Sequence, residues 1–181
     1  MTQMFRFSYG TSVPLFISVF AFYWGTTAFG QTAVADDLTE IEHTVQQIIE
    51  RDGIHVVRFW NPECGNSLSE LQHGLYEVVE NNPEVTFTFV TIWNDNEVGQ
   101  DVLDHYLIPQ RVTVLVQPDN GSSEDIGNRR YQFLGLPVTW TPTTRIYHRN
   151  GVLAYAFNYG EQSPATLQQA IDNTRSEWVH D

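Results

Sequence analysis

FWNPECGNSLSEL, at residues 59–71, is the segment from which the fold is predicted, because it contains Cys64, the single cysteine among 181 residues. It overlaps the β-rich run IHVVRFW at residues 54–60, which predicts a buried strand. Leucines and valines at helical spacing then extend to Val79 and predict an amphipathic helix. Cys64 therefore lies at the junction of a strand and a helix, with Ser67 about one helical turn further on.

The chain around this segment alternates predicted helices with predicted strands. Hydrophobic periodicity predicts helices at residues 38–50, 68–79, 97–108, 123–134 and 163–178. Alternating β-rich runs predict strands at residues 54–60, 85–93 and 112–117, and two more on either side of Asn150 and Gly151. This order predicts one α/β domain with a mixed central β-sheet flanked by helices on both faces.

The first 35 residues have the composition of an export signal. Arg6 is the only charged residue before Asp36, and an apolar run at residues 13–24 precedes small residues suited to cleavage. We expect a signal peptide at residues 1–35 and a domain at residues 36–181, in a periplasmic or other extracytoplasmic location. The alternative is an uncleaved membrane anchor, because the uncharged stretch is long enough to cross a bilayer.

The charge balance of the chain is strongly acidic. Nine arginines, no lysines and 22 acidic residues give a net charge of −13. Nucleic acids and anionic lipid surfaces are therefore disfavoured as partners. A single cysteine in an oxidising compartment cannot form an internal disulfide, so Cys64 either pairs with another molecule or remains a thiol.

Four segments of the chain resemble the thioredoxin fold, and more narrowly the exported TlpA/ResA-like thioredoxins. VVRFWNPECGNSLSEL (residues 56–71) resembles their strand, Phe-Trp pair and Cys-x-x-Cys site that opens a helix. VTVLVQPDNG (112–121) resembles an inserted strand and turn, TPTTRIYHRNG (141–151) the cis-proline segment and hairpin, and YAFNYG (155–160) the last strand. The resemblance implies a thioredoxin fold that includes the inserted helix and strand of TlpA-like proteins.

The same resemblance implies where a substrate binds. It implies a cis bond before Pro142, which faces Cys64, and backbone groups of Thr141 that bind an extended peptide. The candidate catalytic residues are Cys64 and Ser67. The candidate substrate-binding residues are Trp60, Gly65, Asn66, Thr141 and Pro142. Tryptophans such as Trp140 are otherwise expected in the core or in the groove wall.

Three residues depart from the family's pattern at this site. Ser67 stands in place of the second cysteine, Arg58 in place of a buried acid, and Glu63 in place of an aromatic residue. Arg58 would favour the thiolate if it turned toward the sulfur, and Glu63 would oppose it if close. A simpler expectation is that Arg58 reaches the edge of the sheet or pairs with an acid. Ser67 either hydrogen-bonds the thiolate or forms a capping box with Glu70.

Redox chemistry at this site depends on one sulfur. A cysteine at the start of a helix is stabilised as the thiolate, which is the nucleophile. Its attack on a substrate disulfide gives a mixed disulfide, which Ser67 cannot resolve because a hydroxyl is a poor nucleophile toward sulfur. Net two-electron reduction by this domain alone is therefore not expected.

Three functions remain open from the sequence. The first is monothiol exchange with protein or small-molecule thiols and disulfides, as an oxidoreductase or isomerase without a resolving cysteine. The second is a non-catalytic module that holds an extended peptide of a partner protein. The third is a metal site formed by Cys64 and a histidine. His73 is the nearest histidine but lies about two and a half helical turns away, so no metal or cofactor is predicted.

Overall fold

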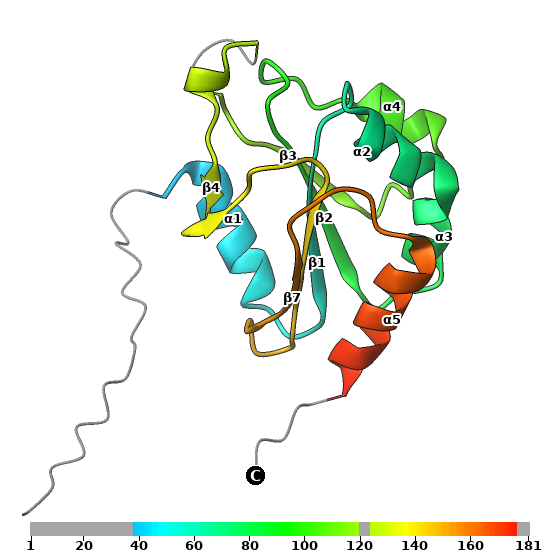
Figure 1. Ribbon diagram of the computed structural model, residues 1–181. Helices are drawn as coiled ribbons and strands as arrows, with labels where there is room; N and C mark the ends of the chain where they lie inside the picture. The colour runs from blue at the N-terminus through cyan, green and yellow to red at the C-terminus, as the bar shows by residue number, and fades with distance from the viewer. Residues whose placement is uncertain (1–37, 120–123, 177–181) are drawn as a thin grey trace, which may run out of the picture. The chain divides into compact units, whose positions relative to one another are not determined.

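The computed structural model describes residues 38–119 and 124–176 (Figure 1). The predicted signal peptide lies outside the described residues. The strands of the main sheet are β1 (His55–Trp60), β2 (Thr86–Thr91), β3 (Thr113–Val116), β6 (Thr143–Tyr147) and β7 (Leu153–Phe157). The helices are α1 (Glu40–Ile49), α2 (Gly65–Glu70), α3 (Tyr76–Glu80), α4 (Gln100–His105) and α5 (Pro164–Arg175), and the kinked segment η1 (Leu71–Leu75) joins α2 to α3. A small second sheet pairs β4 (Gln132–Phe133) with β5 (Leu136–Pro137), after the short 3₁₀ helix η2 (Ile126–Asn128).

The main sheet is mixed, as predicted. Its strand order is β3-β2-β1-β6-β7, with β1 in the centre. β1 pairs in parallel with β2 and antiparallel with β6, and β2 pairs in parallel with β3. The residues that follow Trp60 therefore emerge at the carboxyl edge of the parallel strands, where the loops after β2 and β3 also begin.

Helices cover both faces of the sheet, because alternate residues of β1 point to opposite sides. On one face, Val56 and Trp60 belong to a core formed with η1, α3, α4 and α5. On the other face, Val57 and Phe59 pack in a core with Val45 of α1. The predicted cover on both faces is confirmed. Among the residues that the structure describes, no helix is long and apolar enough to cross a membrane.

The helix predicted at residues 68–79 differs from the observed one at its start and in its middle. It begins three residues earlier, at Gly65, directly after Cys64. It is interrupted at His73 and Gly74, where Gly74 adopts a positive φ of 105°. A side chain at this φ would be strained, so the glycine permits the break between α2 and α3.

The helix predicted at residues 123–134 is wrong in its described part, which instead contains η2 and β4. The buried guanidinium of Arg145 donates hydrogen bonds to the carbonyl oxygens of Phe133 at 2.9 Å, Leu136 at 3.0 Å and Pro137 at 3.2 Å. These tertiary bonds satisfy the carbonyl oxygens of β4, β5 and the turn between them, and so stabilise the hairpin in place of a helix. Periodicity alone does not reveal such a partner, because Arg145 lies on a different strand.

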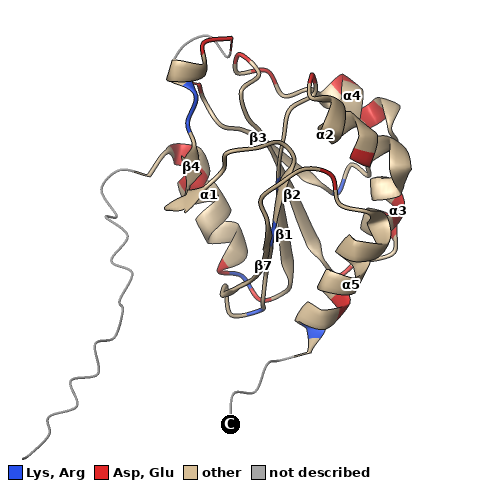
Figure 2. Ribbon diagram, viewed as in Figure 1, with Lys and Arg blue, Asp and Glu red and all other residues tan. Residues whose placement is uncertain are grey.

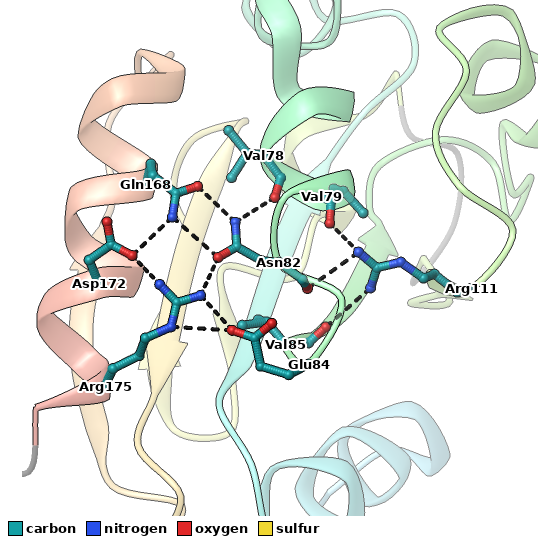
Figure 3. A network of polar contacts seen from close by, with 9 residues as sticks. All are labelled: Val78, Val79, Asn82, Glu84, Val85, Arg111, Gln168, Asp172 and Arg175. Carbon is teal, nitrogen blue, oxygen red and sulfur yellow. Dashed lines mark hydrogen bonds and ion pairs between the residues drawn. The ribbon is translucent and has the colours of Figure 1, made fainter.

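Asn82, in the turn between α3 and β2, connects this turn to α5 (Figure 3). Its buried side-chain amide donates to the carbonyl oxygen of Val78 at 2.6 Å and to Gln168 at 2.7 Å. Its amide oxygen accepts from Arg175 at 2.5 Å, and its backbone carbonyl accepts from Arg111 at 3.3 Å. The network therefore fastens α5 to the turn that precedes β2.

Candidate functional site

Cys64 is the N-cap residue of α2, at the point where the chain leaves β1. Its backbone is extended (φ −84°, ψ 118°), and its carbonyl oxygen accepts the N–H of Leu68 at 3.0 Å. Its Sγ atom lies 3.3 Å from the carbonyl oxygen of Thr141. The peptide bond between Thr141 and Pro142 is cis. The structure thus brings the cysteine together with Thr141 and Pro142, as the resemblance implied.

The surroundings of Cys64 lower the pKa of its thiol below the ordinary cysteine value. Partial burial is the largest single effect and raises the pKa, because it disfavours the charged form. Four hydrogen bonds together lower the pKa by more than burial raises it. Their donors are the side chain of Thr141, the backbone N–H groups of Ser67 and Asn66, and the hydroxyl of Ser67. The Thr141 carbonyl oxygen accepts only from the neutral thiol and so acts against these four donors. Cys64 therefore reaches its reactive thiolate form at a lower pH than an ordinary cysteine.

Ser67 is fully buried in the first turn of α2, on the side of Cys64. Its hydroxyl oxygen accepts the backbone N–H of Asn61 at 3.3 Å, and its hydroxyl also lowers the pKa of Cys64. The alternative of a capping box between Ser67 and Glu70 is wrong, because Cys64 and not Ser67 is the N-cap residue. The structure thus favours the role of a thiolate partner for this serine.

Arg58 lies in the centre of β1 and forms an ion pair with Glu70 of α2. The two side chains are 1% and 2% exposed, so the prediction that Arg58 reaches the edge of the sheet is wrong and the prediction of an acidic partner is confirmed. Glu70 also accepts the backbone N–H of Gln162 at 2.7 Å. Arg58 therefore neutralises a buried carboxylate, and it is not among the main groups that shift the pKa of Cys64.

The sequence prediction that Trp60 binds the substrate is wrong, because this side chain is not accessible to a substrate. Its side chain is fully buried and packs in the core against Phe89, with ring centroids 6.3 Å apart. Trp140 is 48% exposed and lies beside Cys64 in the wall of an open groove. Both tryptophans lie close to site residues in the sequence, but the fold directs the side chain of Trp60 into the core and leaves that of Trp140 exposed.

The groove beside Cys64 has a volume of about 520 Å³. Cys64 and Thr141 are among the residues that line it, and Gly65 and Asn66 are exposed at the start of α2. Its aromatic lining consists of Trp93, Tyr131 and Trp140, and its charged lining consists of Glu63, Glu124 and Arg129. The remaining lining residues are Asn61, Ile126 and Thr139. A volume of this size is within the range of sites that bind small ligands.

One wall of the groove comes from residues 124–139, which the sequence did not identify as part of the site. Glu42 of α1, which is 3% exposed, holds this segment through the backbone N–H of Leu134 at 2.7 Å and the side chain of Arg130 at 3.2 Å. Arg145 holds the same segment from β6. Tyr131, Trp140 and the apolar residues near them were a sequence signal for this wall of the groove. The signal was missed because the segment was predicted to be a helix.

The side chain of His73 contacts Glu161 and Ser69 and not Cys64. Its Nδ1 atom lies 2.9 Å from Glu161 and 3.1 Å from Ser69. Across residues 38–119 and 124–176, no group of three or more histidine, cysteine, aspartate or glutamate side chains has an arrangement suited to a metal ion.

Comparisons with known proteins connect this geometry to solved structures. No protein-family model and no curated protein matches the chain. A secreted disulfide oxidoreductase from Mycobacterium tuberculosis, homologous to E. coli DsbE, is 22% identical, covering 68% of this chain and 84% of its own, with a TM-score of 0.51. A DsbF homologue from Corynebacterium diphtheriae is 22% identical, covering 68% and 73% respectively, with a TM-score of 0.52. A secreted thiol-disulfide isomerase from Corynebacterium glutamicum is 16% identical, covering 70% and 73%, with a TM-score of 0.51. These similarities and the observed strand order show that the chain has the thioredoxin fold.

Proposed function

We propose that this protein acts in thiol–disulfide exchange through Cys64 alone. The observation that carries the proposal is a partly exposed Sγ atom, with a lowered pKa, in the lining of a groove beside Thr141. The names of the structurally similar proteins, which include a disulfide oxidoreductase and a thiol-disulfide isomerase, agree with this chemistry. Ser67 and the N–H groups of α2 stabilise the thiolate, and Thr141 lies where a bound peptide passes the sulfur.

The proposed step is a balanced exchange between two sulfur pairs. The Cys64 thiolate attacks one sulfur of a substrate disulfide, so that a new S–S bond forms and the substrate S–S bond breaks. The departing substrate sulfur leaves as a thiolate, which takes a proton from water. In formal terms the departing sulfur gains one electron and Cys64 loses one, while the attacked sulfur stays at the disulfide level, so this step needs no outside oxidant or reductant.

The mixed disulfide is resolved by a sulfur from another molecule or from the substrate itself. Ser67 is adjacent to Cys64 but carries no sulfur, so it cannot release the product. A second thiol of the substrate would return Cys64 to its starting state with a rearranged disulfide, which is isomerisation. A small thiol that attacks the Cys64 sulfur would instead release the substrate as a thiol and leave Cys64 in a mixed disulfide with the small thiol, which a second small thiol would then displace to restore the Cys64 thiolate.

The second candidate is a non-catalytic module that holds a partner peptide. The observation that favours it is the open groove with its three aromatic residues, which has the character of a binding site whether or not the sulfur reacts. In this case replacement of the sulfur would leave capture of the partner unchanged.

Mixed-disulfide formation separates the two candidates. Incubation with a peptide whose cysteine carries a thiopyridyl group should add the peptide mass to wild-type protein and not to Cys64→Ser. With dithiothreitol as the reductant, Ser67→Cys should in addition gain catalysis of insulin reduction, because residues one turn apart have Cβ atoms only ~5–6 Å apart and a small adjustment permits a disulfide. A wild-type protein that binds the peptide without forming the adduct would support the binding module.

We also propose that the chain is exported, with a signal peptide at residues 1–35. The charge pattern of this segment supports the proposal, and two structurally similar proteins are named as secreted. N-terminal sequencing of the protein recovered from outside the cytoplasm should begin near Asp36. A full-length chain that remains with the membrane would support the uncleaved anchor instead.

A further inference from the structure

The loops around Cys64 carry an excess of negative charge. In the described residues, the loops that follow β1, β2 and β3, together with the segment before η2, contain Glu63, Asp95, Glu97, Asp119, Glu124 and Asp125. Figure 2 shows acidic positions in the loops at the end of the molecule where α2 begins. Arg129 and Arg130 are the basic residues of the adjoining segment, and Arg130 is paired with Glu42 at 3.2 Å. The field at the groove is therefore negative.

The same groove exposes apolar side chains that soluble proteins usually bury. Ile126 is 65% exposed, Tyr131 is 38% exposed and Trp140 is 48% exposed, and all three line the groove. Large apolar groups that are exposed together mark a surface for binding. An occupant with aromatic or aliphatic side chains would remove this surface from water.

The groove lining also shows that its aromatic surface accepts a guanidinium group. The guanidinium carbon of Arg129 lies 5.1 Å from the centre of the Trp93 ring, which is a cation–π distance. The exposed ring of Trp140, which lines the same groove as the carboxylate of Glu63, offers the same kind of contact to a cation from a partner. Glutathione has two carboxylates and one ammonium group, so this field opposes its approach.

We propose that the substrate is an extended protein segment in which the reacting cysteine is flanked by basic and by aromatic or aliphatic residues. The covalent step rests on the proposed function of Cys64, in which the Cys64 thiolate forms an S–S bond with the substrate sulfur and the other substrate sulfur leaves. The specificity rests on the groove itself. Basic groups complement the acidic loops, and apolar side chains cover Ile126, Tyr131 and Trp140.

Three disulfides with the same thiopyridyl leaving group test this specificity. The first is the peptide Trp-Arg-Cys-Arg-Phe, the second replaces both arginines with glutamates, and the third is glutathione. At ~0.01 M salt we expect the basic peptide to react about tenfold faster than the other two. At ~1 M salt, where the Debye length is only ~3 Å, the ratio of the basic to the acidic peptide should fall below about twofold.

Single substitutions locate the specificity on the groove. Glu63→Gln should slow the basic peptide about twofold and speed the acidic one, because a rim charge acts mainly on the association rate. Glu80→Gln removes the same charge from an exposed position of α3 and is the matched control, with no change in the ratio. Trp140→Ala should slow both peptides about fivefold and leave glutathione unchanged.

The outcomes distinguish this inference from the proposed function. Equal rates for the three disulfides, or glutathione as the fastest, would overturn the inference and leave exchange at Cys64 intact. Reaction with none of them would contradict the exchange function. In that event, binding of the basic and acidic peptides, each with serine in place of cysteine, to Cys64→Ser tests the inference. Tighter binding of the basic peptide would support the inference, and equal binding would overturn it.

Discussion

Arg58 of the central strand and Glu70 of the helix that begins at Cys64 form an ion pair in which neither side chain is more than 2% exposed. Glu70 also accepts the backbone N–H of Gln162, which precedes α5. The guanidinium of Arg58 lies 5.9 Å from the ring centre of Phe89. The pair therefore joins β1, α2 and the segment before α5 beneath the candidate site, and it does so without a net buried charge.

Removal of one partner of this ion pair should be strongly destabilising. Arg58→Met or Glu70→Gln leaves the opposite charge buried without compensation, at a cost of ~3–5 kcal/mol in the free energy of unfolding. The double variant Arg58→Met/Glu70→Leu should lose much less than the sum of the single losses. Urea unfolding measures all three, and Arg149→Met, which breaks an exposed pair with Asp52, serves as a control with little change. Additive single losses would contradict the coupling between the two residues.

Ser67→Ala should raise the pKa of Cys64. The hydroxyl of Ser67 is one of four donors that favour the thiolate, and its loss leaves the opposing effect of burial larger. In wild type, the lowered pKa means that alkylation stays fast at a pH below the ordinary cysteine range of ~8.5. In Ser67→Ala, the curve of alkylation rate against pH should move to higher pH.

Ser69→Ala is the matched control for this measurement. Its hydroxyl donates to Glu161 at 2.8 Å and is not among the main groups that shift the pKa of Cys64. Its alkylation curve should coincide with that of wild type. An unchanged curve in Ser67→Ala would show that the backbone N–H groups and Thr141 are enough to stabilise the thiolate.

Asn82→Ala should destabilise the fold by roughly 1–3 kcal/mol, because it removes a fully buried amide that bonds the carbonyl oxygen of buried Val78 and the half-buried side chain of Gln168 in the network of Figure 3. Gln169→Ala removes an exposed amide that donates to Asn173 within α5, and it should have little effect. Thermal unfolding of both variants tests this. Similar losses in the two variants would mean that the network contributes no more than an exposed pair.

Arg175→Gln should flatten the loss of stability in acid. The hydrogen bond from Arg175 lowers the pKa of Glu84, so the folded state holds this proton less tightly than the unfolded state does. The pair therefore stabilises the fold above the ordinary glutamate pKa of ~4.3, and this contribution is lost as the pH falls through the lowered folded value. Melting temperatures between pH 6 and pH 2.5 should show a shallower decline in Arg175→Gln than in wild type. Arg51→Gln removes the same charge at another exposed position and serves as the control. If its melting temperature declined with falling pH as little as that of Arg175→Gln, the effect could not be assigned to the pair of Arg175 and Glu84.

The local sequence was sufficient for the elements that create the candidate site. A buried apolar run predicts β1 and regularly spaced leucines predict the helix after Cys64, because both signals depend only on neighbouring residues. The wall at residues 124–139 was not predictable in this way. Its backbone groups bond to Glu42 and Arg145, so its conformation is decided by residues distant in the sequence.

The residues of one short segment are enough to predict that a single sulfur lies between a strand and a helix, and that Ser67 cannot act as a second sulfur. Both statements follow from residue identity and spacing along a single segment. The packing of the folded chain, in contrast, determines that Arg58 pairs with Glu70, that Trp60 is buried, and that Trp140 lines the groove. The physical reason is that burial and charge pairing depend on which distant segments pack against a side chain, and a local pattern does not contain that information.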